Sequence, residues 1–505
     1  TTLESVGAAG VPMRFDRSDG VFCHVTSLPG PHGIGDLGDG AATFLSFLGE
    51  SGVDYWQVCP LGPTIGAAGE SPYQSPSAFA GNPLFIDLHG LVEEGWLEPA
   101  ALEPVPSFPR DRVDYEAVRE YTHPRLRSAF ERFDATADAA ATLDDFRERE
   151  PWVDDYALFR ALSAARPEDT WVEWPAPLRT RDPEALDAAR ESHATEIRYR
   201  TFLQWVFDRQ WTALRERAAA AGVEIVGDVP IYVALDSADV WASPSAFRLD
   251  AENRPTVVAG VPPNRGDDGQ RWGNPVYDWD HLADTGFDWW LDRFRRLFEL
   301  ADVVRLDHVL GFVRYWAIPA AADDPAAGEW CDGPGRTLFD AVEREFGDVP
   351  FIAEDLGFED RRMEDLLTAF EIPGMRVPQY ANWAEAGNPY QPMHYPERVV
   401  GYTSTHDTDT WVGYYEDLPE SQRDALHYNL GVGDRPIEWA IIDEVWGSEA
   451  ILAMTTVQDL LGLGSEARLN EPGTVAGNWE WRVSSEALSD ELAARLREVG
   501  AFHVR

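Results

Sequence analysis

Carboxylates follow three apolar segments of this chain, at the point where a buried strand would emerge from its core. Asp307 ends one such run, and Arg305 precedes it by two positions. Because side chains alternate between the two faces of a strand, Arg305 and Asp307 share one face. Glu354 and Asp355 follow a second apolar run, and Asp407 follows a third. Carboxylates at the carboxyl ends of several parallel strands are typical of the active site of a (β/α)8 barrel.

Converging carboxylates without an accompanying Ser, Cys or Lys nucleophile indicate glycoside chemistry. Transfer with retention needs a carboxylate nucleophile and a carboxylic acid about 5–5.5 Å away. Asp307 suits the first role, since Arg305 beside it would favour the ionised form and lower its pKa. The acid must stay protonated, which nearby negative charges promote. Alternation allows only one of Glu354 and Asp355 to face the barrel interior, and the pattern alone does not say which.

Asp407, preceded by His406, has the chemistry of a third participant. Its carboxylate could accept hydrogen bonds from sugar hydroxyls and stabilise an oxocarbenium-like transition state. The alternative for each carboxylate is a purely structural role, as a helix N-cap or a salt-bridge partner. Three of them at strand ends favour the catalytic interpretation.

The elements that must position these residues are short runs rich in branched side chains. We predict seven barrel strands at 53–59, 223–226, 303–306, 351–353, 375–377, 399–402 and 451–457, and an eighth near 84–88 or 21–25. Helix-length segments separate many of them. The prediction is therefore one catalytic (β/α)8 TIM barrel of the α/β class over residues 1–505. A helical insertion is expected at about 90–220, and a loop-rich insertion with an active-site lid at about 235–280.

The charge of the chain narrows the list of partners. It carries 88 acidic residues against 42 basic ones, a formal net charge of −46, and the sequence contains no lysine. A polyanion repels the phosphates of nucleic acids and of anionic lipids, so we expect neither a nucleic-acid nor a membrane partner. Acid enrichment without lysine indicates a halophile, because molar salt shortens the Debye length to roughly 3 Å and screens the self-repulsion.

The absence of lysine also excludes Schiff-base catalysis, pyridoxal phosphate anchoring and a Walker-A phosphate loop. Three widely separated cysteines imply no disulfide framework, and no motif has the spacing of a transition-metal site. We expect no metal and no organic cofactor. The first residues do not resemble a signal peptide, and no apolar run approaches the ~20 residues that span a bilayer, so a cytoplasmic location is expected.

Two aromatic residues lie in Gly/Pro-rich stretches where packing alone would not demand a large ring. They are Tyr73, in SPYQSPSAFAGNP (71–83), and Trp272, in GQRWGNP (269–275). Aromatic faces combine an apolar surface with a polar edge, as the faces and hydroxyls of sugars do. Both residues are therefore candidates for a sugar-binding surface.

A set of longer blocks occurs in a fixed order along the chain. Besides 71–83, these blocks are HVTSLPGPHGIGDLG (24–38), GDVPIYVALDSADVWA (227–242), VRLDHVLGF (304–312), AEDLG (353–357), PGMRVPQY (373–380), STHDTDTWVG (404–413) and QDLLGLGSEARLNEPGTVAGNWEWR (458–482). Together they resemble the 4-α-glucanotransferases called amylomaltases or disproportionating enzymes. The resemblance runs from about residue 20 to 482 and is weakest near 90–220 and 320–345.

The resemblance implies a (β/α)8 barrel that moves α-1,4-glucan segments from a donor maltodextrin to the 4-hydroxyl of another glucan or of glucose. It implies Asp307 as nucleophile, Glu354 as acid/base and Asp407 as transition-state stabiliser. It implies no metal and no cofactor. The positions that match donor- or acceptor-binding residues of the family are Ser71, Tyr73, Asp228, Gln270, Trp272, Arg305, His308, His406 and Asn478.

One departure from the family concerns the expected lid. After 261–263 the family usually carries an aromatic pair and hydroxyl residues, whereas this chain has Asn264-Arg265-Gly266-Asp267-Asp268 and is one residue shorter. Acceptor preference and leakage to water are the properties that this change puts in question. Two other functions remain open to the sequence: an α-glucan hydrolase with the same carboxylates, and a non-catalytic glucan-binding barrel.

Overall fold

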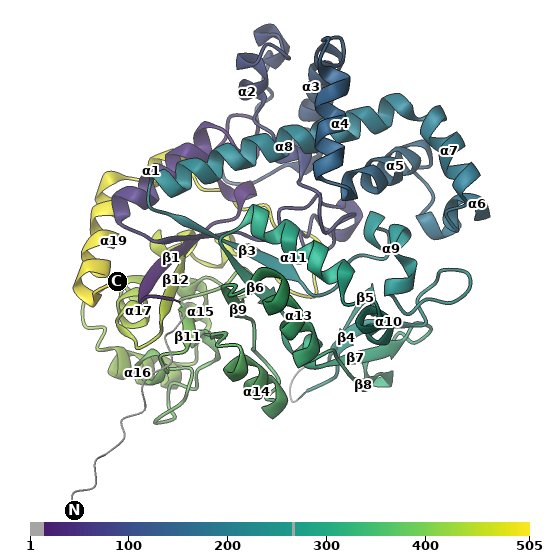
Figure 1. The fold of residues 1–505 in the computed structure, drawn as a ribbon. Coiled ribbons are helices and arrows are strands. Elements are labelled where there is room, and N and C mark those ends of the chain that lie inside the picture. Colours follow the sequence, from purple (N-terminus) through teal and green to yellow (C-terminus); the bar gives the residue numbers. More distant parts are fainter. Residues whose placement is uncertain (1–14, 265–267) are drawn as a thin grey trace, which may run out of the picture.

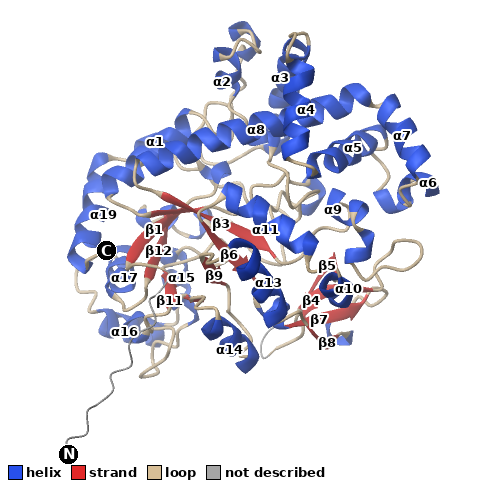
Figure 2. Ribbon diagram, in the orientation of Figure 1, coloured by secondary structure: helices blue, strands red, loops and turns tan. Residues whose placement is uncertain are grey.

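The computed structural model describes residues 15–264 and 268–505, and its centre is a closed barrel of parallel strands (Figures 1 and 2). Around the barrel, the strands lie in the order β1 (Ser18–Phe22), β12 (Leu452–Thr456), β11 (Val399–Tyr402), β10 (Gly374–Arg376), β9 (Phe351–Ala353), β6 (Val303–Asp307), β3 (Glu224–Pro230) and β2 (Tyr55–Gln57). The predicted fold class is confirmed.

Each of the seven predicted runs overlaps a barrel strand. The eighth strand, β1, overlaps the 21–25 alternative at Val21 and Phe22, whereas the 84–88 alternative is wrong: a short 3-10 helix occupies Pro83–Phe85 and α2 begins at Leu88. Asn82 explains the difference, since its side chain accepts a hydrogen bond from Leu84 N–H and caps the 3-10 turn. An apolar run that short does not distinguish a strand from a buried helical turn.

Alternation along the barrel strands separates an inner from an outer set of apolar side chains. One buried cluster joins Val226, Val303, Ile352, Val400 and Leu452, which come from five different barrel strands. Neighbours of these residues along four of the strands belong to the large cluster shared with the surrounding helices: Ile225, Val304, Phe351, Ala353 and Ala453. Both faces of each strand are therefore buried, which accounts for runs without polar alternation in the sequence.

Helices surround the barrel and connect its strands (Figure 2). Those helices are α1 (Asp39–Ser51), α8 (Ala194–Ala220), α11 (Asp288–Leu300), α12 (Leu310–Val313), α13 (Arg336–Phe346), α14 (Arg361–Ala369), α15 (Trp411–Asp417), α16 (Glu420–Leu430), α17 (Ile437–Gly447), α18 (Val457–Leu460) and α19 (Asp490–His503). Among them α11 packs on β3 and β6. Its buried Arg293 donates hydrogen bonds to the carbonyls of Pro230 (2.5 Å) and Ile231 (3.1 Å), which fixes the end of β3.

Between β2 and β3 the chain forms a helical layer that extends away from the barrel along α8 (Figure 1). The aromatic rings of Trp96, Phe133, Phe202 and Trp205 pack together, with centroids about 5–6 Å apart, where this layer meets α8. The helices of the layer are α2 (Leu88–Glu93), α3 (Tyr115–Asp134), α4 (Ala139–Arg149), α5 (Trp152–Ala165), α6 (Ala176–Arg179) and α7 (Pro183–Ser192).

The stretch between β3 and β6 contributes two strands to a sheet that the sequence analysis did not predict, and the other two strands of that sheet follow β6. Strands β4 (Val257–Val261) and β5 (Gln270–Pro275) pair with β7 (Arg314–Pro319) and β8 (Glu329–Asp332) in the antiparallel order β5-β4-β7-β8. Two short helices, α9 (Ala238–Ala242) and α10 (Trp279–Asp284), flank it. Of the predicted lid at 264–268, residues 265–267 lie outside the described residues. Within the described ranges, no helix has both the length and the apolar character needed to cross a membrane.

The barrel closes where its first strand in the sequence pairs with its last. Strand β1 pairs with β12 from Ser18↔Leu452 to Phe22↔Thr456. The last residue, Arg505, donates hydrogen bonds to the carbonyls of Ser18 and Ala450, both at 2.8 Å. This closure is completed on the outside by α1 packing against α19.

Candidate active site

Polar residues continue the inward-facing set of the barrel strands at their carboxyl ends. The register pairs Asp228 of β3 with Arg305 of β6, and Arg305 with Ile352 of β9. Paired residues of neighbouring parallel strands point to the same face. The last pair of β6 with β9 is Leu306↔Ala353, so Asp307 and Glu354 are the next residues along the two strands. The fold thus brings these side chains to one end of the barrel interior.

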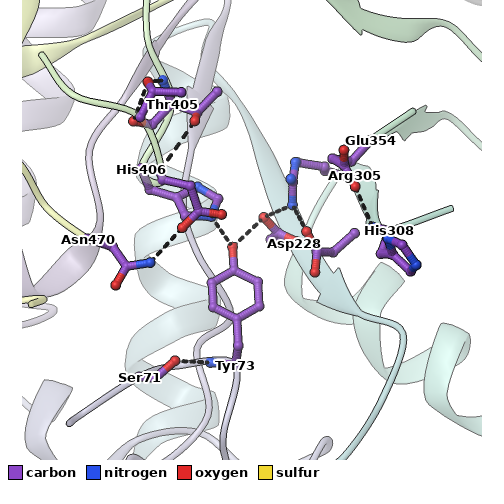
Figure 3. A network of polar contacts seen from close by, with 12 residues as sticks. Ser71, Tyr73, Asp228, Arg305, His308, Glu354, Thr405, His406 and Asn470 are labelled. Atoms are coloured by element: carbon purple, nitrogen blue, oxygen red, sulfur yellow. Dashed lines mark hydrogen bonds and ion pairs between the residues drawn. The ribbon is translucent and has the colours of Figure 1, made fainter. Parts of the chain in front are cut away.

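Arg305 links two carboxylates at this end (Figure 3). Its Nη1 lies 2.7 Å from Oδ2 of Asp228 and 2.9 Å from Oδ1 of Asp307. Although burial alone would lower the pKa of Arg305, the charges of Asp228 and Asp307 raise it well above its ordinary value. The side chain of Asp307 is 26% exposed, and its Oδ2 makes no hydrogen bond to the described residues. Arg305 therefore orients Asp307 through one oxygen and leaves the other directed to an incoming group.

Glu354 has the opposite electrostatic environment. Burial raises the pKa of Glu354 to about 8, and the negative charge of Asp307 adds to the rise. The backbone N–H groups of His308 and Leu356 donate to its two oxygens, both at 2.9 Å, and hold the side chain in place. At neutral pH this carboxyl is protonated, while Asp307 is held by a cation. This contrast is the arrangement that an acid and a nucleophile require.

Asp355, the residue that the strand pattern left as an alternative to Glu354, faces elsewhere. Its Oδ1 accepts a hydrogen bond from Met375 N–H at 2.7 Å, and its Oδ2 lies 3.3 Å from Arg376 Nη1. These contacts join β9 to β10. Asp355 thus connects neighbouring segments of the barrel wall, whereas Glu354 lines the cavity.

Asp407 lies on the loop after β11. Asn470 donates to its Oδ1 at 2.6 Å, and His406 Nε2 lies 3.3 Å from its Oδ2. Burial would raise the pKa of Asp407, but the charge and hydrogen bond of His406, together with the hydrogen bond from Asn470, lower it to about 2. The side chain is 43% exposed. It therefore presents a fixed negative charge to the cavity.

Tyr73 joins the two sides of the site (Figure 3). Its hydroxyl donates to Oδ2 of Asp228 at 2.9 Å and lies 2.8 Å from His406 Nε2. The ring stacks on His406 with centroids 5.3 Å apart and planes 19° apart. One hydrogen-bonded chain thus runs from Asp307 through Arg305, Asp228 and Tyr73 to His406.

Tyr73 and the carboxyl groups of Asp307, Glu354 and Asp407 line a cavity of about 970 Å³, which is at the upper end of the size of small-ligand sites. One wall comes from β5, where the indole N–H of Trp272 donates to Gln270 Oε1 at 2.8 Å. Trp272 also meets the ring of His308 edge to face, with centroids 5.0 Å apart. Of the residues that the sequence analysis proposed, those in the cavity wall are Ser71, Tyr73, Gln270, Trp272, Arg305, Asp307, His308, Glu354, Asp407 and Asn478.

Some proposed residues have structural contacts rather than open polar groups. Asp228 and His406 are buried behind the cavity and act through Arg305, Tyr73 and Asp407. Ser71 Oγ accepts a hydrogen bond from Tyr73 N–H at 3.3 Å. The amide of Asn478 is engaged with its own loop, accepting from Glu471 N–H and donating to Thr474.

Among the cavity-lining residues that the sequence analysis did not single out are Asn470, Tyr380 and Tyr390. Asn470 contacts Asp407 across a sequence separation of 63 residues, so no local spacing could reveal the pair. Tyr380 is 52% exposed and meets Tyr390 edge to face with centroids 5.9 Å apart. Tyr380 closely follows β10, so the strand-end argument that identified the carboxylates could have identified it too.

Comparison with known proteins places this geometry in a family. A family model described as 4-alpha-glucanotransferase matches residues 23–488. The 4-alpha-glucanotransferase of Thermus thermophilus is 47% identical over 96% of this chain and 98% of its own length. The 4-alpha-glucanotransferase of Synechocystis is 42% identical over 98% of this chain and 99% of its own length. The solved amylomaltase from Streptococcus agalactiae in complex with acarbose is 36% identical, covers 97% of this chain and 99% of its own, and superposes with a TM-score of 0.94.

Proposed function

The chain belongs to the 4-alpha-glucanotransferase family, glycoside hydrolase family 77, and on this basis we propose that it transfers α-1,4-glucan segments with retention, by double displacement through a glycosyl-enzyme on Asp307. The activity of the family is transfer, and hydrolysis is not favoured. One observation carries the proposal: Asp307, oriented by Arg305, adjoins Glu354, whose pKa is about 8. Such a pair supplies a nucleophile and an acid at the same pH.

In the first half of the proposed reaction, Glu354 gives its proton to the glycosidic oxygen as the bond from that oxygen to C1 breaks. Oδ2 of Asp307 forms the new bond to C1, and the shortened glucan leaves with the proton. Asp407, ionised because of its low pKa, accepts hydrogen bonds from ring hydroxyls and stabilises the positive charge that develops on the sugar.

In the second half, the 4-hydroxyl of an acceptor glucan or of glucose takes the place of the departed chain. Glu354, now a carboxylate, removes the hydroxyl proton while the acceptor oxygen attacks C1 and Asp307 is released. The new α-1,4 bond has the configuration of the old one. No metal or organic cofactor takes part in either half.

The remaining residues have proposed binding roles. Gln270, Trp272 and His308 offer an aromatic and amide wall for sugar rings, and Ser71 and Asn478 hold the loops that carry Tyr73 and line the cavity mouth. Asp228 and His406 keep the charges of Arg305 and Asp407 in place. The proposed ligands are maltodextrins, fragments of starch or glycogen, and glucose as acceptor.

Incubation of the purified protein with maltotriose tests the proposal. Transfer conserves the number of glycosidic bonds, so we expect glucose, maltose and a ladder of longer oligosaccharides while the concentration of reducing ends stays constant. Accumulation of glucose and maltose alone, with rising reducing ends, would identify a hydrolase. Unchanged maltotriose would identify a barrel that binds without catalysis.

We further propose that the protein works in the molar salt of a halophile's cytoplasm. A charge of −46 without a lysine supports this setting, and so do three cysteines that form no disulfide. Many arginines are paired with carboxylates at the surface, but such exposed pairs contribute only about 0–1 kcal/mol each and do not offset the excess of acid.

Thermal unfolding should therefore depend steeply on salt. We expect the melting temperature to rise as KCl increases from about 0.1 M to about 3 M, because the ions screen the repulsion between carboxylates. Sucrose at matched osmolality is the control, since it favours the compact state without screening charge. A melting temperature independent of KCl, or raised equally by sucrose, would remove the halophile proposal.

A further inference from the structure

The loop that carries His406 and Asp407 spans residues 403–410, between β11 and the first residue of α15. It has no regular secondary structure. Its internal hydrogen bonds are local, such as Thr405 N–H to Thr408 Oγ1 (2.9 Å) and Asp407 N–H to Thr405 Oγ1 (3.3 Å). A loop of this kind needs external supports to keep a carboxylate within a few tenths of an ångström of a working position.

A single buried carboxylate, Asp459, contacts both ends of this loop. Its Oδ2 accepts hydrogen bonds from Thr403 Oγ1 (2.6 Å) and Ser404 Oγ (2.5 Å), where the loop begins. Its Oδ1 accepts from Trp411 N–H (2.7 Å), where the loop passes into α15. Asp459 is 0% exposed, so water does not compete for these bonds.

Asp459 is itself fixed to the barrel. It lies on α18, directly after β12, and its N–H bonds to Oγ1 of Thr456 (3.2 Å), the residue that caps α18. Side-chain hydroxyls also join the ends of β11 and β12 directly. Thr403 Oγ1 lies 3.0 Å from Thr455 Oγ1, and Ser404 Oγ lies 3.1 Å from Thr456 Oγ1. The two strands thus share a buried network with Asp459 at its centre.

The chemistry of this network calls for a carboxylate. Both oxygens of Asp459 face donors, and among the described residues none of its hydrogen-bond partners carries a charge. On balance the pKa of Asp459 is raised, because burial raises it more than the hydrogen bonds from Ser404, Thr403 and Trp411 lower it. An asparagine would turn an amide N–H toward groups that donate, and the contact geometry would change.

We propose that Asp459 is a positioning residue for transfer, which holds both ends of the 403–410 loop so that Asp407 meets the sugar in the transition state. The inference rests on the role proposed above for Asp407. Asp459 does not line the cavity, so we infer that it acts only through the loop.

Two variants weaken the network by different amounts. Asp459→Asn replaces the central acceptor, and Thr403→Val removes one hydroxyl with little change of shape. We expect kcat per folded molecule to fall roughly 10- to 100-fold for Asp459→Asn, as a misplacement of about 1 Å does, and less for Thr403→Val. The KM for maltotriose should change little, because the rest of the cavity wall still binds the donor.

Matched controls separate positioning from folding. Asp36→Asn alters another buried carboxylate that accepts a backbone N–H, and Thr201→Val alters a buried threonine bonded only to its own helix. Both should lower the melting temperature without changing kcat per folded molecule. If Asp459→Asn behaves as Asp36→Asn does, the proposal is wrong. If Asp459→Asn does not fold, the kcat of Thr403→Val is compared with that of Thr201→Val instead. A kcat of Thr403→Val as high as that of Thr201→Val would show that the proposal is wrong.

Asp407→Asn, alone and combined with Asp459→Asn, tells the two proposals apart. If Asp459 acts through Asp407, the double variant should be little slower than Asp407→Asn alone. Additive losses would show that Asp459 acts by another route and would overturn the inference. Full activity of Asp407→Asn would instead contradict the proposed function, because the premise about Asp407 would be gone.

Discussion

Replacing Asp307 by asparagine should abolish transfer while leaving the fold intact. The neutral amide cannot form the glycosyl-enzyme, and loss of a covalent nucleophile costs roughly 10⁴–10⁶-fold in kcat. Arg305 keeps its bond to Asp228, so the variant does not leave a buried cation unpaired. Transfer from maltotriose, measured together with circular dichroism, tests the expectation.

Asp302→Asn is the matched control for that experiment. Asp302 precedes β6 at the opposite end from Asp307, where its Oδ2 accepts a hydrogen bond from Ile225 N–H at 2.8 Å and its Oδ1 pairs with Arg215. This variant should lose some stability and retain nearly wild-type kcat. Near-normal activity of Asp307→Asn, or an equal loss in Asp302→Asn, would remove Asp307 from the nucleophile's role.

Replacing Glu354 by glutamine should slow transfer from maltotriose roughly 10²–10⁴-fold, the usual contribution of general acid catalysis. An α-maltosyl fluoride donor should restore the first half of the reaction, because fluoride leaves without a proton. The second half still needs a base, so the glycosyl-enzyme should accumulate, and mass spectrometry of the peptide that contains Asp307 would detect it.

The same residue sets a pH dependence in the wild-type enzyme. Glu354 must be protonated to act as the acid, and its pKa is about 8. The rate with maltotriose should therefore fall as the pH rises through about 8. The Glu354→Gln variant, assayed with the fluoride donor, should not show this fall in rate. Asp355→Asn is the control: any loss it causes should be equal for both donors. If Glu354→Gln slowed the first half of the reaction equally with both donors, measured as release of the leaving group in a single turnover, Glu354 would be excluded as the acid.

The sequence pattern predicted the barrel because each strand is a short, continuous segment that can be identified from its own residues. Runs such as 303–306 and 399–402 are short and rich in branched side chains. Because both faces of these strands are buried, the runs are almost continuously apolar and can be recognised in the sequence. The strand-end rule then located Asp307, the pair 354–355 and Asp407 without any knowledge of contacts. The choice between Glu354 and Asp355 depends on where β9 ends, and a shift of one residue would exchange their faces.

What the pattern missed depends on contacts between distant segments. Strand β4 pairs with β7, a segment beyond β6 that no local window contains, and β5, which includes a Gly and a Pro, pairs only with β4 among the described strands. The role of Asn470 depends on its contact with Asp407, and the role of Asp459 depends on its contacts with the two ends of the 403–410 loop. Such residues have no characteristic neighbours along the chain.

The meeting of β1 with β12 has a consequence for biosynthesis. Ser18 receives its hydrogen bond from Arg505, 487 residues later, so the first strand emerges from the ribosome long before its partner exists. At roughly 5–20 residues per second, that wait lasts about 25–100 s. During it one edge of the nascent sheet stays open to other chains. The five-residue length of β1 limits how much of that edge another chain could pair with before β12 is made.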